Sequence, residues 1–347
     1  MSRTARLCLL AALALGALAL GVGVGSVYVP PAAVARILAN RLFGCPLPAG
    51  LDPVWPGLVT GIRLPRVLTA FWAGAALAVS GAVMQSVLKN PLASSYGLGV
   101  SSGAGLGAAL VMLCGLDAGW PGRLLLPAAG LGLGLLAVAA AVAVAARIDR
   151  GLSDSTIILT GMVLSLFLNA LLNLLASANP QYTHRLLLWQ LGSFSGRDTL
   201  SIALLAAVTL ACTLLCWGGG RQLDVLSFGD EQAMAMGLAP RRAKWFFLVV
   251  TAVLTGTAVS LVGIIGFVDL IAPHVVRRFF GSSHRWVLPA SALFGGAFMT
   301  LCDLAGRTLA APAEIPVGSI TALLGAPFFL YLCLARRKKA QEGGDAV

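Results

Sequence analysis

Apolar runs of about twenty residues recur along almost the whole chain, and each is long enough to cross a bilayer as an α-helix. The chain is 58% hydrophobic and only 11% charged, with a mean hydropathy of +0.90. Soluble domains carry roughly a quarter charged residues. A transmembrane β-barrel would instead show short segments of alternating hydrophobicity. The sequence therefore predicts an all-α, polytopic membrane protein with a single transmembrane domain over residues 1–347.

About ten transmembrane helices can be placed. The candidate spans cover residues 7–28, 66–88, 95–114, 124–146, 155–177, 199–217, 245–264, 266–280, 286–306 and 318–335. The first is longer than the core of a signal peptide, about 7–15 residues, so we expect it to be retained. The eighth is short and contains Pro273 and His274, so it can cross only where protein surrounds its polar groups.

The distribution of basic residues predicts the orientation. An even number of spans places both termini on one side. With the N-terminus inside, sixteen of the 24 Lys and Arg residues fall in cytoplasmic segments and eight in external ones. This asymmetry predicts an N-in, C-in topology. The lysines are all on the inner side, at Lys89, Lys244, Lys338 and Lys339.

The net charge of +11 does not indicate a nucleic-acid partner. The basic residues are scattered between apolar runs, where they suit topology signals and lipid headgroups. Membrane lipid is therefore an expected partner, and nucleic acid is not.

Two stretches of small residues predict tight helix packing. SSGAGLGAAL begins at Ser101 and GLGLGLL begins at Gly130. Glycine and alanine faces allow helix backbones to approach closely in lipid. The contact they form can lie within one chain or in a dimer.

The sequence contains no recognisable catalytic or metal-binding constellation. There are three histidines, and neither an HExxH nor a GxSxG motif occurs. Cys212 and Cys216 have helical spacing, but no histidine or carboxylate accompanies them, so small buried hydrophobes are expected. No lysine sits in the Gly-Lys-Ser/Thr context of a phosphate-binding loop. The chain therefore has no recognisable nucleotide-binding loop of its own.

One polar segment, RQLDVLSFGDEQAMAMGLAPRRAKW, interrupts the apolar pattern. Ser227 followed by Asp230 resembles a capping box. Gly237 is a natural left-handed helix stop, and Pro240 suits the first position of a following helix. These signals predict a short helix over residues 228–236 and a second helix that continues into the seventh span. From spacing alone, the pair is either a capped turn or a docking surface for a soluble partner.

Four long motifs extend from about residue 60 to the end of the chain. They are RLPRVLTAFWAGAALAVSGAVMQSVLKNPLASSYGLGVSSGAGLGAAL (63–110), FGDEQAMAMGLAPRRAK (228–244), GFVDLIAPHVVRRFFGSSHRWVLPASALFGG (266–296) and DLAGRTLAAPAEIPVGSITALLGAPFFLYL (303–332). Together with the span count, they resemble the permease subunit of the ATP-binding-cassette importers that take up iron–siderophore complexes, haem and cobalamin.

The resemblance implies an assembly and a location. Two permeases form a homodimer, and the substrate passes along their interface. Two cytoplasmic ATPase subunits hold ATP and Mg²⁺, so no cofactor is expected in this chain. An extracytoplasmic substrate-binding protein delivers the substrate, and the expected membrane is the bacterial inner membrane.

The polar segment acquires a role from the resemblance. Residues 228–244 match the cytoplasmic coupling helices on which the ATPase subunits dock. The residues expected to form this coupling surface are Phe228, Gly229, Asp230, Glu231, Ala233, Met234, Gly237, Leu238, Arg241 and Arg242.

On the outer side, the resemblance implies arginines that pair with glutamates of the binding protein. The matching residues are Arg63, Arg66 and Arg307. The arginine fork binds carboxylates in a bidentate manner, which suits this task. The residues themselves leave another role open: Arg63 and Arg66 can be interface anchors, and Arg307 can form a local i,i+4 ion pair with Asp303.

The inner gate of the related permeases lies at the cytoplasmic ends of spans two and five. The matching residues are Asn90, Pro91 and Leu92, and Ser153, Asp154 and Ser155. Asp154 departs from the small hydroxyl residue expected at its position.

Three further residues are singled out. Asp269 stands where the related permeases have glycine, and a carboxylate at membrane depth needs a partner or a water-filled cavity. Asp269 is therefore either part of the pathway or bonded to a nearby hydroxyl or amide. His274 is expected to be structural, and Glu314 marks the break before the last helix.

We expect a ferric chelate as the substrate, because it is the commonest substrate of the related permeases. Haem or cobalamin, moved by the same mechanism, is the alternative. A different class, an ion-coupled secondary transporter, would use Asp269 and Asp303 as relays and would not need the coupling helices.

Overall fold

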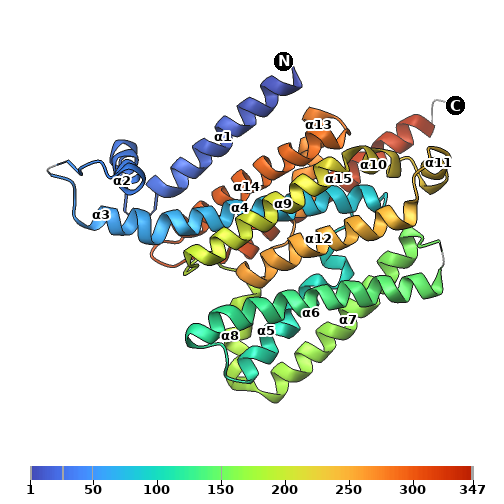
Figure 1. Ribbon diagram of the computed structural model, residues 1–347, viewed down its shortest axis with the longest axis horizontal. Helices are drawn as coiled ribbons and strands as arrows, with labels where there is room; N and C mark the ends of the chain where they lie inside the picture. Colours follow the sequence, from blue (N-terminus) through green and yellow to red (C-terminus); the bar gives the residue numbers. More distant parts are fainter. Residues whose placement is uncertain (1, 26, 49, 150, 345–347) are drawn as a thin grey trace.

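The structure, a computed structural model, describes residues 2–25, 27–48, 50–149 and 151–344, with the side chains of 120, 121 and 332–344 excepted. The helices that coincide with the ten expected spans are α1 (Arg3–Gly23), α4 (Leu64–Val87), α5 (Val100–Leu113), α6 (Gly119–Ile148), α7 (Asp154–Ala178), α9 (Thr199–Gly218), α12 (Pro240–Val262), α13 (Val268–Phe280), α14 (His284–Thr308) and α15 (Val317–Gly344). Within this part of the chain, seven helices are long and apolar enough to cross a membrane, and α5 and α15 have shorter apolar stretches. The prediction of an all-α, polytopic fold is confirmed (Figure 1).

Several shorter elements were not predicted. They are α2 (Pro31–Phe43), α3 (Val54–Gly57), the π-helical turn η1 (Leu58–Arg63), the 3₁₀ turn η2 (Ser95–Leu98), α8 (Pro180–Gln190) and α10 (Gly220–Leu226), whereas α11 (Asp230–Ala235) is the short helix expected over residues 228–236. Most are shorter than a bilayer span. A search for twenty-residue apolar runs therefore passes over them, although prolines at the first positions of α2 and α8 mark their starts.

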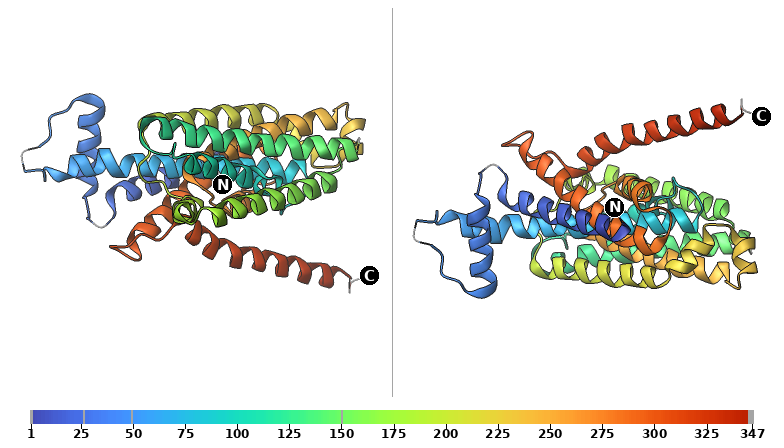
Figure 2. Two further views of the ribbon diagram at one scale, coloured as in Figure 1. Left: turned by 90° about the horizontal axis from the view of Figure 1, so that it is seen from below. Right: turned by 90° about the horizontal axis from the view of Figure 1, so that it is seen from above.

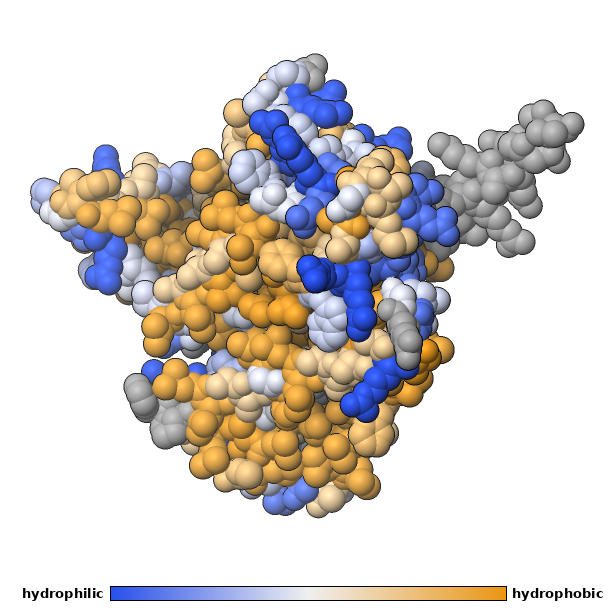
Figure 3. All heavy atoms as spheres, turned by 45° about the vertical axis from the view of Figure 1, so that its right-hand side comes forward, coloured by the Kyte–Doolittle hydropathy of each residue, from blue (hydrophilic) through white to orange (hydrophobic). Residues whose placement is uncertain are grey.

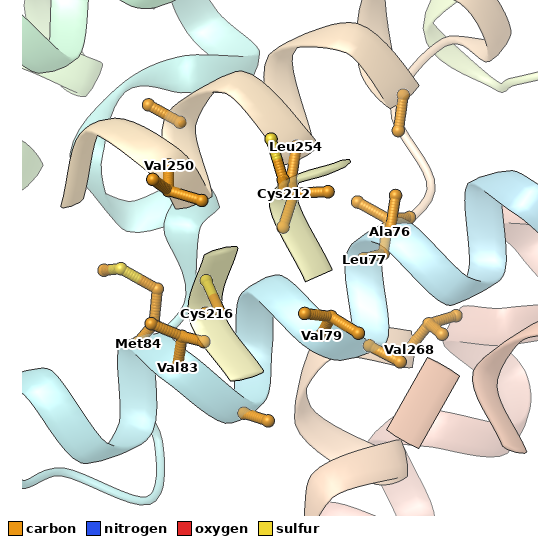
Figure 4. Packing of buried hydrophobic residues seen from close by; sticks show 14 of the residues in the cluster. Ala76, Leu77, Val79, Val83, Met84, Cys212, Cys216, Val250, Leu254 and Val268 are labelled. Atoms are coloured by element: carbon orange, nitrogen blue, oxygen red, sulfur yellow. The ribbon is translucent and has the colours of Figure 1, made fainter. Parts of the chain in front are cut away.

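Helix α4 is the centre of the molecule. It packs on α14, α12, α13 and α9. In the most apolar stretch of this helix, 83% of the residues are buried, whereas about a fifth are buried in the corresponding stretches of the peripheral helices α1, α7 and α9. The buried residues of α4 are largely alanine, glycine and valine, so the neighbouring helices can approach it closely. Figure 4 shows this core between α4, α9 and α12, with the unpaired thiols of Cys212 and Cys216 buried in it as expected.

Glycines set the closest approaches to α4. A Cβ on Gly74 would lie 2.2 Å from the carbonyl oxygen of Gly295 in α14. A Cβ on Gly81 would lie 1.9 Å from the carbonyl oxygen of Asp269 in α13. Helix α13 has 13 residues, about 20 Å at about 1.5 Å per residue, which is shorter than a bilayer core. As expected for the eighth span, protein surrounds it, because it packs on α4, α14 and α15.

The two small-residue stretches pack on each other within the chain. A Cβ on Gly103 of α5 would lie 2.5 Å from the carbonyl oxygen of Leu133 in α6, and one on Gly107 would lie 2.4 Å from that of Ala129. The prediction of tight packing is confirmed, and the contact joins α5 to α6. Figure 1 shows α5, α6, α7 and α8 as one group beside the helices around α4.

The two ends of the bundle differ in what they carry. The far end of α15, α10 and α11 lie toward one end, and α2, α3 and α8 lie toward the other (Figure 1). The start of α1 lies beside the end of α13, where Arg6 donates to the Phe279 carbonyl oxygen. This is the arrangement that the even span count predicts; the side chains of Lys338 and Lys339 lie outside the described residues. Figure 3 shows a broad apolar surface with hydrophilic residues gathered along part of its margin. Helix α15 leans away from the bundle (Figure 2).

We predict that Gly81→Ala destabilises the protein. The added methyl group would overlap the backbone of α13, which no side-chain rotation can relieve. The cost should be at least about 1–3 kcal/mol, measured as a lower apparent melting temperature in detergent. The control is Gly132→Ala in α6, where a Cβ meets nothing within 4 Å and helix propensity should raise stability by up to about 1 kcal/mol. Equal melting temperatures for the two variants would contradict the packing described here.

Candidate functional site

The coupling segment lies between α10 and α12. Helix α11 begins at Asp230, after Gly229 with φ 120°, and Gly237 with φ 81° ends the turn that follows it. Pro240 is the first residue of α12. The short helix, the glycine stop and the proline start are confirmed. The capping box is wrong, because the Ser227 hydroxyl donates to the Asp224 carbonyl oxygen at 2.6 Å instead of capping α11.

Helix α11 is anchored by one face and presents the other. Ala233 is fully buried, whereas Phe228 and Met234 have exposed fractions of 68% and 58%. Glu231, Arg241 and Arg242 are exposed beside them. The predicted coupling residues therefore form a mixed apolar and charged surface at the cytoplasmic end of the bundle. Exposed apolar side chains gathered outside the lipid-facing belt are typical of a protein-docking surface.

Behind this surface, four charged residues form a closed ring, which we call the ion-pair ring: Lys89, Asp154, Asp230 and Lys244. The Lys89 ammonium lies 2.8 Å from Asp154 Oδ2 and 2.9 Å from Asp230 Oδ1. The Lys244 ammonium lies 2.7 Å from Asp154 Oδ1 and 2.6 Å from Asp230 Oδ2. Each carboxylate thus bridges both ammonium groups, and the four charges sum to zero.

The Lys244 side chain is completely buried, and its three donors are all used. Besides the two carboxylates, it donates to the Leu152 carbonyl oxygen at 3.0 Å. A buried ammonium is tolerated only when it is paired and fully hydrogen-bonded. Sequence analysis did not assign Lys89 or Lys244 to the site. The available signal was Asp154, an unexpected acid that required a cationic partner.

Within the ion-pair ring, the neighbouring opposite charges favour the charged forms of Lys89 and Asp230. Burial opposes the charge on Lys89, but Asp154 and Asp230 outweigh it and raise the pKa of Lys89 above 10.5. Burial likewise disfavours the carboxylate of Asp230, but Lys244 and Lys89 outweigh it and lower the pKa of Asp230 below 3.8. Lys89 and Asp230 therefore stay charged across the physiological pH range.

The ion-pair ring brings the two predicted gate segments together with the coupling helix. Lys89 immediately precedes Asn90, Pro91 and Leu92, where the Asn90 side-chain oxygen accepts from the Leu92 amide at 2.9 Å. Asp154 lies between Ser153 and Ser155 at the start of α7. The Lys89–Asp154 pair joins the two segments directly, and both residues also connect through the ring to α11.

A second polar cluster ties α10 to the same end of α4. The Asp224 carboxylate accepts from the His284 amide at 2.9 Å and lies 2.5 Å from His284 Nδ1. His284 Nε2 lies 2.7 Å from the Ser86 hydroxyl, which also accepts from Arg277 at 2.8 Å. Sequence analysis missed this cluster, whose members come from four separate helices. It fixes α10, α13 and α14 against α4.

The three arginines predicted for docking lie at the outer end and are bonded inside the protein. Arg63, Arg66 and Arg307 have exposed fractions of 3%, 7% and 9%. Arg63 donates to backbone carbonyl oxygens at the end of α1 and beyond it, including that of Gly23 at 2.9 Å.

The other two arginines share one buried acid. Arg66 lies 2.8 Å from Asp303 and donates to both oxygens of Glu314, at 2.8 and 3.0 Å. Arg307 lies 3.0 Å from Asp303 and donates to the Gly21 carbonyl oxygen at 2.9 Å. These contacts correspond to the anchoring and i,i+4 ion-pair roles. The docking role stays a prediction.

Asp269 has a local partner. It is 1% exposed, and the Ser94 hydroxyl donates to its carboxylate. This is the hydroxyl contact that was one of its two expected environments. The His274 ring meets the Phe328 ring edge-on, with centroids 6.0 Å apart. Glu314 lies in the break between α14 and α15, as expected. Across the residues that the structure describes, no group of three or more His, Cys, Asp or Glu residues could hold a metal ion.

We predict that Asp303→Asn is strongly destabilising, because it leaves Arg66 and Arg307 buried without their shared counter-charge. Breaking a buried ion pair from one side costs about 3–5 kcal/mol. The control is Asp117→Asn, which breaks the Asp117–Arg185 pair, whose arginine is 61% exposed, and should cost at most about 1 kcal/mol. The melting temperatures of the two variants are measured in detergent. Similar values would show that Asp303 is not the key counter-ion of Arg66 and Arg307.

We also predict that the stability supplied by Lys89 and Asp230 of the ion-pair ring is independent of pH between about 5 and 9. The part that depends on Lys89 is complete below pH 10.5 and is lost only as the pH rises through its raised pKa. The part that depends on Asp230 is complete above pH 3.8 and is lost as the pH falls through its lowered pKa. The difference in melting temperature between the parent protein and Lys89→Gln should stay constant over this range. A difference that changes between pH 5 and 9 would contradict the assigned charge states.

Comparison with known proteins places the chain in a family. Residues 11–335 match the FecCD transport family. The chain is 34% identical over 325 residues to the Fe(3+)-citrate import system permease protein YfmE of Bacillus subtilis (strain 168), covering 92% of each protein. It is 36% identical over 290 residues to the hemin transport system permease protein HmuU of Yersinia pestis, covering 83% of this chain and 86% of that protein.

A solved structure is similar over nearly the whole length. It is an ABC transporter assigned to the metal-chelate type, in an inward-facing conformation. The TM-score is 0.80 at 28% sequence identity, and the match covers 96% of this chain and 99% of that one. The chain therefore belongs to the FecCD transport family and is a permease subunit of an ABC transporter, not its ATPase.

Proposed function

We propose that the chain is the permease of an ATP-driven importer that moves an iron(III)–siderophore or a related ferric chelate into the cytoplasm of a bacterium. It acts as a homodimer in the inner membrane, with two cytoplasmic ATPase subunits that supply ATP and Mg²⁺ and an extracytoplasmic substrate-binding protein. The observation that carries the proposal is the exposed surface of α11, joined through the ion-pair ring to both gate segments. A secondary transporter has no use for such a linked docking surface.

The ferric substrate is supported by the similarity to the Fe(3+)-citrate permease. Haem is the second candidate, because the hemin permease is equally similar. The chain itself offers no metal-ligand cluster among its described residues, which suits a path that passes an intact chelate and leaves selection to the binding protein.

Two helices support a dimer interface. In the most apolar stretch of α7, only 17% of the residues are buried within one chain. The exposed side chains of this helix include Val163, Leu166 and Phe167. Helix α15 leans away from the bundle (Figure 2), and Leu323, Leu324 and Leu330 on it are exposed. A second copy packed against these faces would enclose a path between the two chains.

We propose that the binding protein docks at the outer end. Arg66 forms an ion pair there with Glu314, whose side chain is 55% exposed. Docking through Arg66 requires it to exchange Glu314 for a glutamate of the partner. The three buried arginines would then act only after a rearrangement at this end.

The proposal is tested first by co-purification. The tagged chain is extracted in mild detergent with its genomic neighbours expressed, and the associated proteins are identified. A stoichiometric ABC ATPase supports the proposal, and an accompanying binding protein can be titrated with ferric chelates, haem and cobalamin to identify the substrate. Absence of an ATPase, together with gradient-driven uptake in vesicles, contradicts the proposal and supports the ion-coupled alternative.

We predict that Met234→Lys weakens ATPase binding without unfolding the permease. Met234 is exposed on α11, so the change removes an apolar contact only where a partner covers it. The dissociation constant should rise at least about tenfold, or about 1.4 kcal/mol. The control is Phe43→Lys on α2, which exchanges an exposed apolar residue at the opposite end and should leave ATPase binding unchanged. Unchanged binding for Met234→Lys would remove α11 from the interface.

A further inference from the structure

We propose that the ion-pair ring transmits movement from α11 to the two gate segments, and that Lys89 and Asp154 are positioning residues for gating. This inference rests on the proposed function, since the ring can couple movements only in a permease that an ATPase drives.

The ring draws its members from four separate places. Lys89 follows α4, Asp154 begins α7, Asp230 begins α11, and Lys244 lies in the first turns of α12. Asp230 is the only member on the coupling helix, and it bonds both ammonium groups. Any displacement of α11 therefore pulls on both lysines, and through them on Asp154.

The burial of Lys244 makes the ring move as a unit. Its ammonium is completely buried and has two carboxylates and one carbonyl oxygen as partners. If α11 moved alone, it would withdraw Asp230. The buried Lys244 ammonium would then lose one of its three hydrogen-bond acceptors, which costs free energy in a buried site. Moving the gate segments together with α11 keeps all the bonds and avoids that cost.

The backbone around the ring shows that the loops are held in place. Lys89 has φ 45° and Leu152 has φ 54°, which are left-handed values that residues other than glycine adopt rarely. Only one other non-glycine residue in the described chain, Phe267, has a positive φ. Backbone conformations of this kind persist where surrounding contacts fix them, and both Lys89 and the Leu152 carbonyl group are bonded within the ring.

The ring also crosses the boundary between the two groups of helices. Helix α7 packs on α5, α6, α8 and η2, whereas α4 packs on α9, α12, α13 and α14. The Lys89–Asp154 pair gives the end of α4 a direct tie to the start of α7.

The test measures gate movement, because a purely structural role would not change it. Leu92 lies in a gate segment and is 49% exposed, so Leu92→Cys can carry a spin label in a chain whose native cysteines have been replaced. The full dimer is assembled with its ATPase in nanodiscs. Pulsed EPR then gives the distance between the two labels, without nucleotide and with Mg-ATP and vanadate. ATP hydrolysis is measured on the same samples.

The variants are Asp154→Asn, Lys89→Gln and the conservative Asp154→Glu. The matched control is Asp198→Asn on the outer side, where asparagine can still accept the Ser201 amide that caps α9. In the parent protein we expect nucleotide to shift the label distance. In Asp154→Asn and Lys89→Gln, the ratio of shifted to unshifted dimers should fall roughly tenfold while hydrolysis continues. Asp154→Glu should restore most of the shift, and the control should match the parent protein.

The outcomes separate this inference from the proposed function. A full nucleotide-dependent shift in both Asp154→Asn and Lys89→Gln overturns the inference and leaves the proposed function intact. If Asp154→Asn does not assemble, Lys89→Gln decides, because it leaves every bond of the buried Lys244 in place. If the parent protein binds no ATPase or shows no shift, the proposed function fails, and the inference fails with it.

Discussion

The pairing of buried charge is the constraint on which the rest of this structure depends. A bilayer offers no water to solvate an ion, so each charge near it needs a partner from the protein. The chain satisfies this need in clusters at the two ends of α4. At the outer end, Asp303 serves both Arg66 and Arg307. At the inner end, the ion-pair ring serves Lys89 and the fully buried Lys244.

The clusters divide the molecule into rigid and movable parts. Helices α4 and α14 approach to backbone contact at Gly74 and Gly295, and both carry members of the polar clusters at each end. Their relative position is therefore fixed along the whole span. Helices α5 to α8 pack on one another and reach the rigid pair mainly through α12, and α7 exposes most of its surface. Movement that opens a path should thus occur between α7 and the rigid pair, where the ring connects them.

Sequence reasoning located the spans because a twenty-residue apolar run is an unambiguous signal. It also located the ends of the coupling turn, since Gly237 and Pro240 have backbone requirements that few other residues meet. It failed at Ser227 and Asp230, because the predicted capping box does not form and Asp230 pairs with Lys89 and Lys244 instead. The Asp230 carboxylate gains more from two lysines than from a helix end, and one of those lysines comes from a distant part of the chain.

The same limit explains what sequence reasoning could and could not say about the site. It placed the gate and coupling segments by resemblance, yet nothing in the one-dimensional pattern showed that Lys89 and Lys244 would meet between them. The outer arginines show the converse. Their residue type fits carboxylate recognition, and the structure gives each of them partners inside the protein. An arginine at the mouth of a permease can therefore be both an anchor and a docking group only if docking rearranges the anchor. The exposed Glu314 is the partner that can be exchanged with the smallest loss, because water can solvate it when Arg66 leaves, whereas Asp303 is wholly buried and cannot be released.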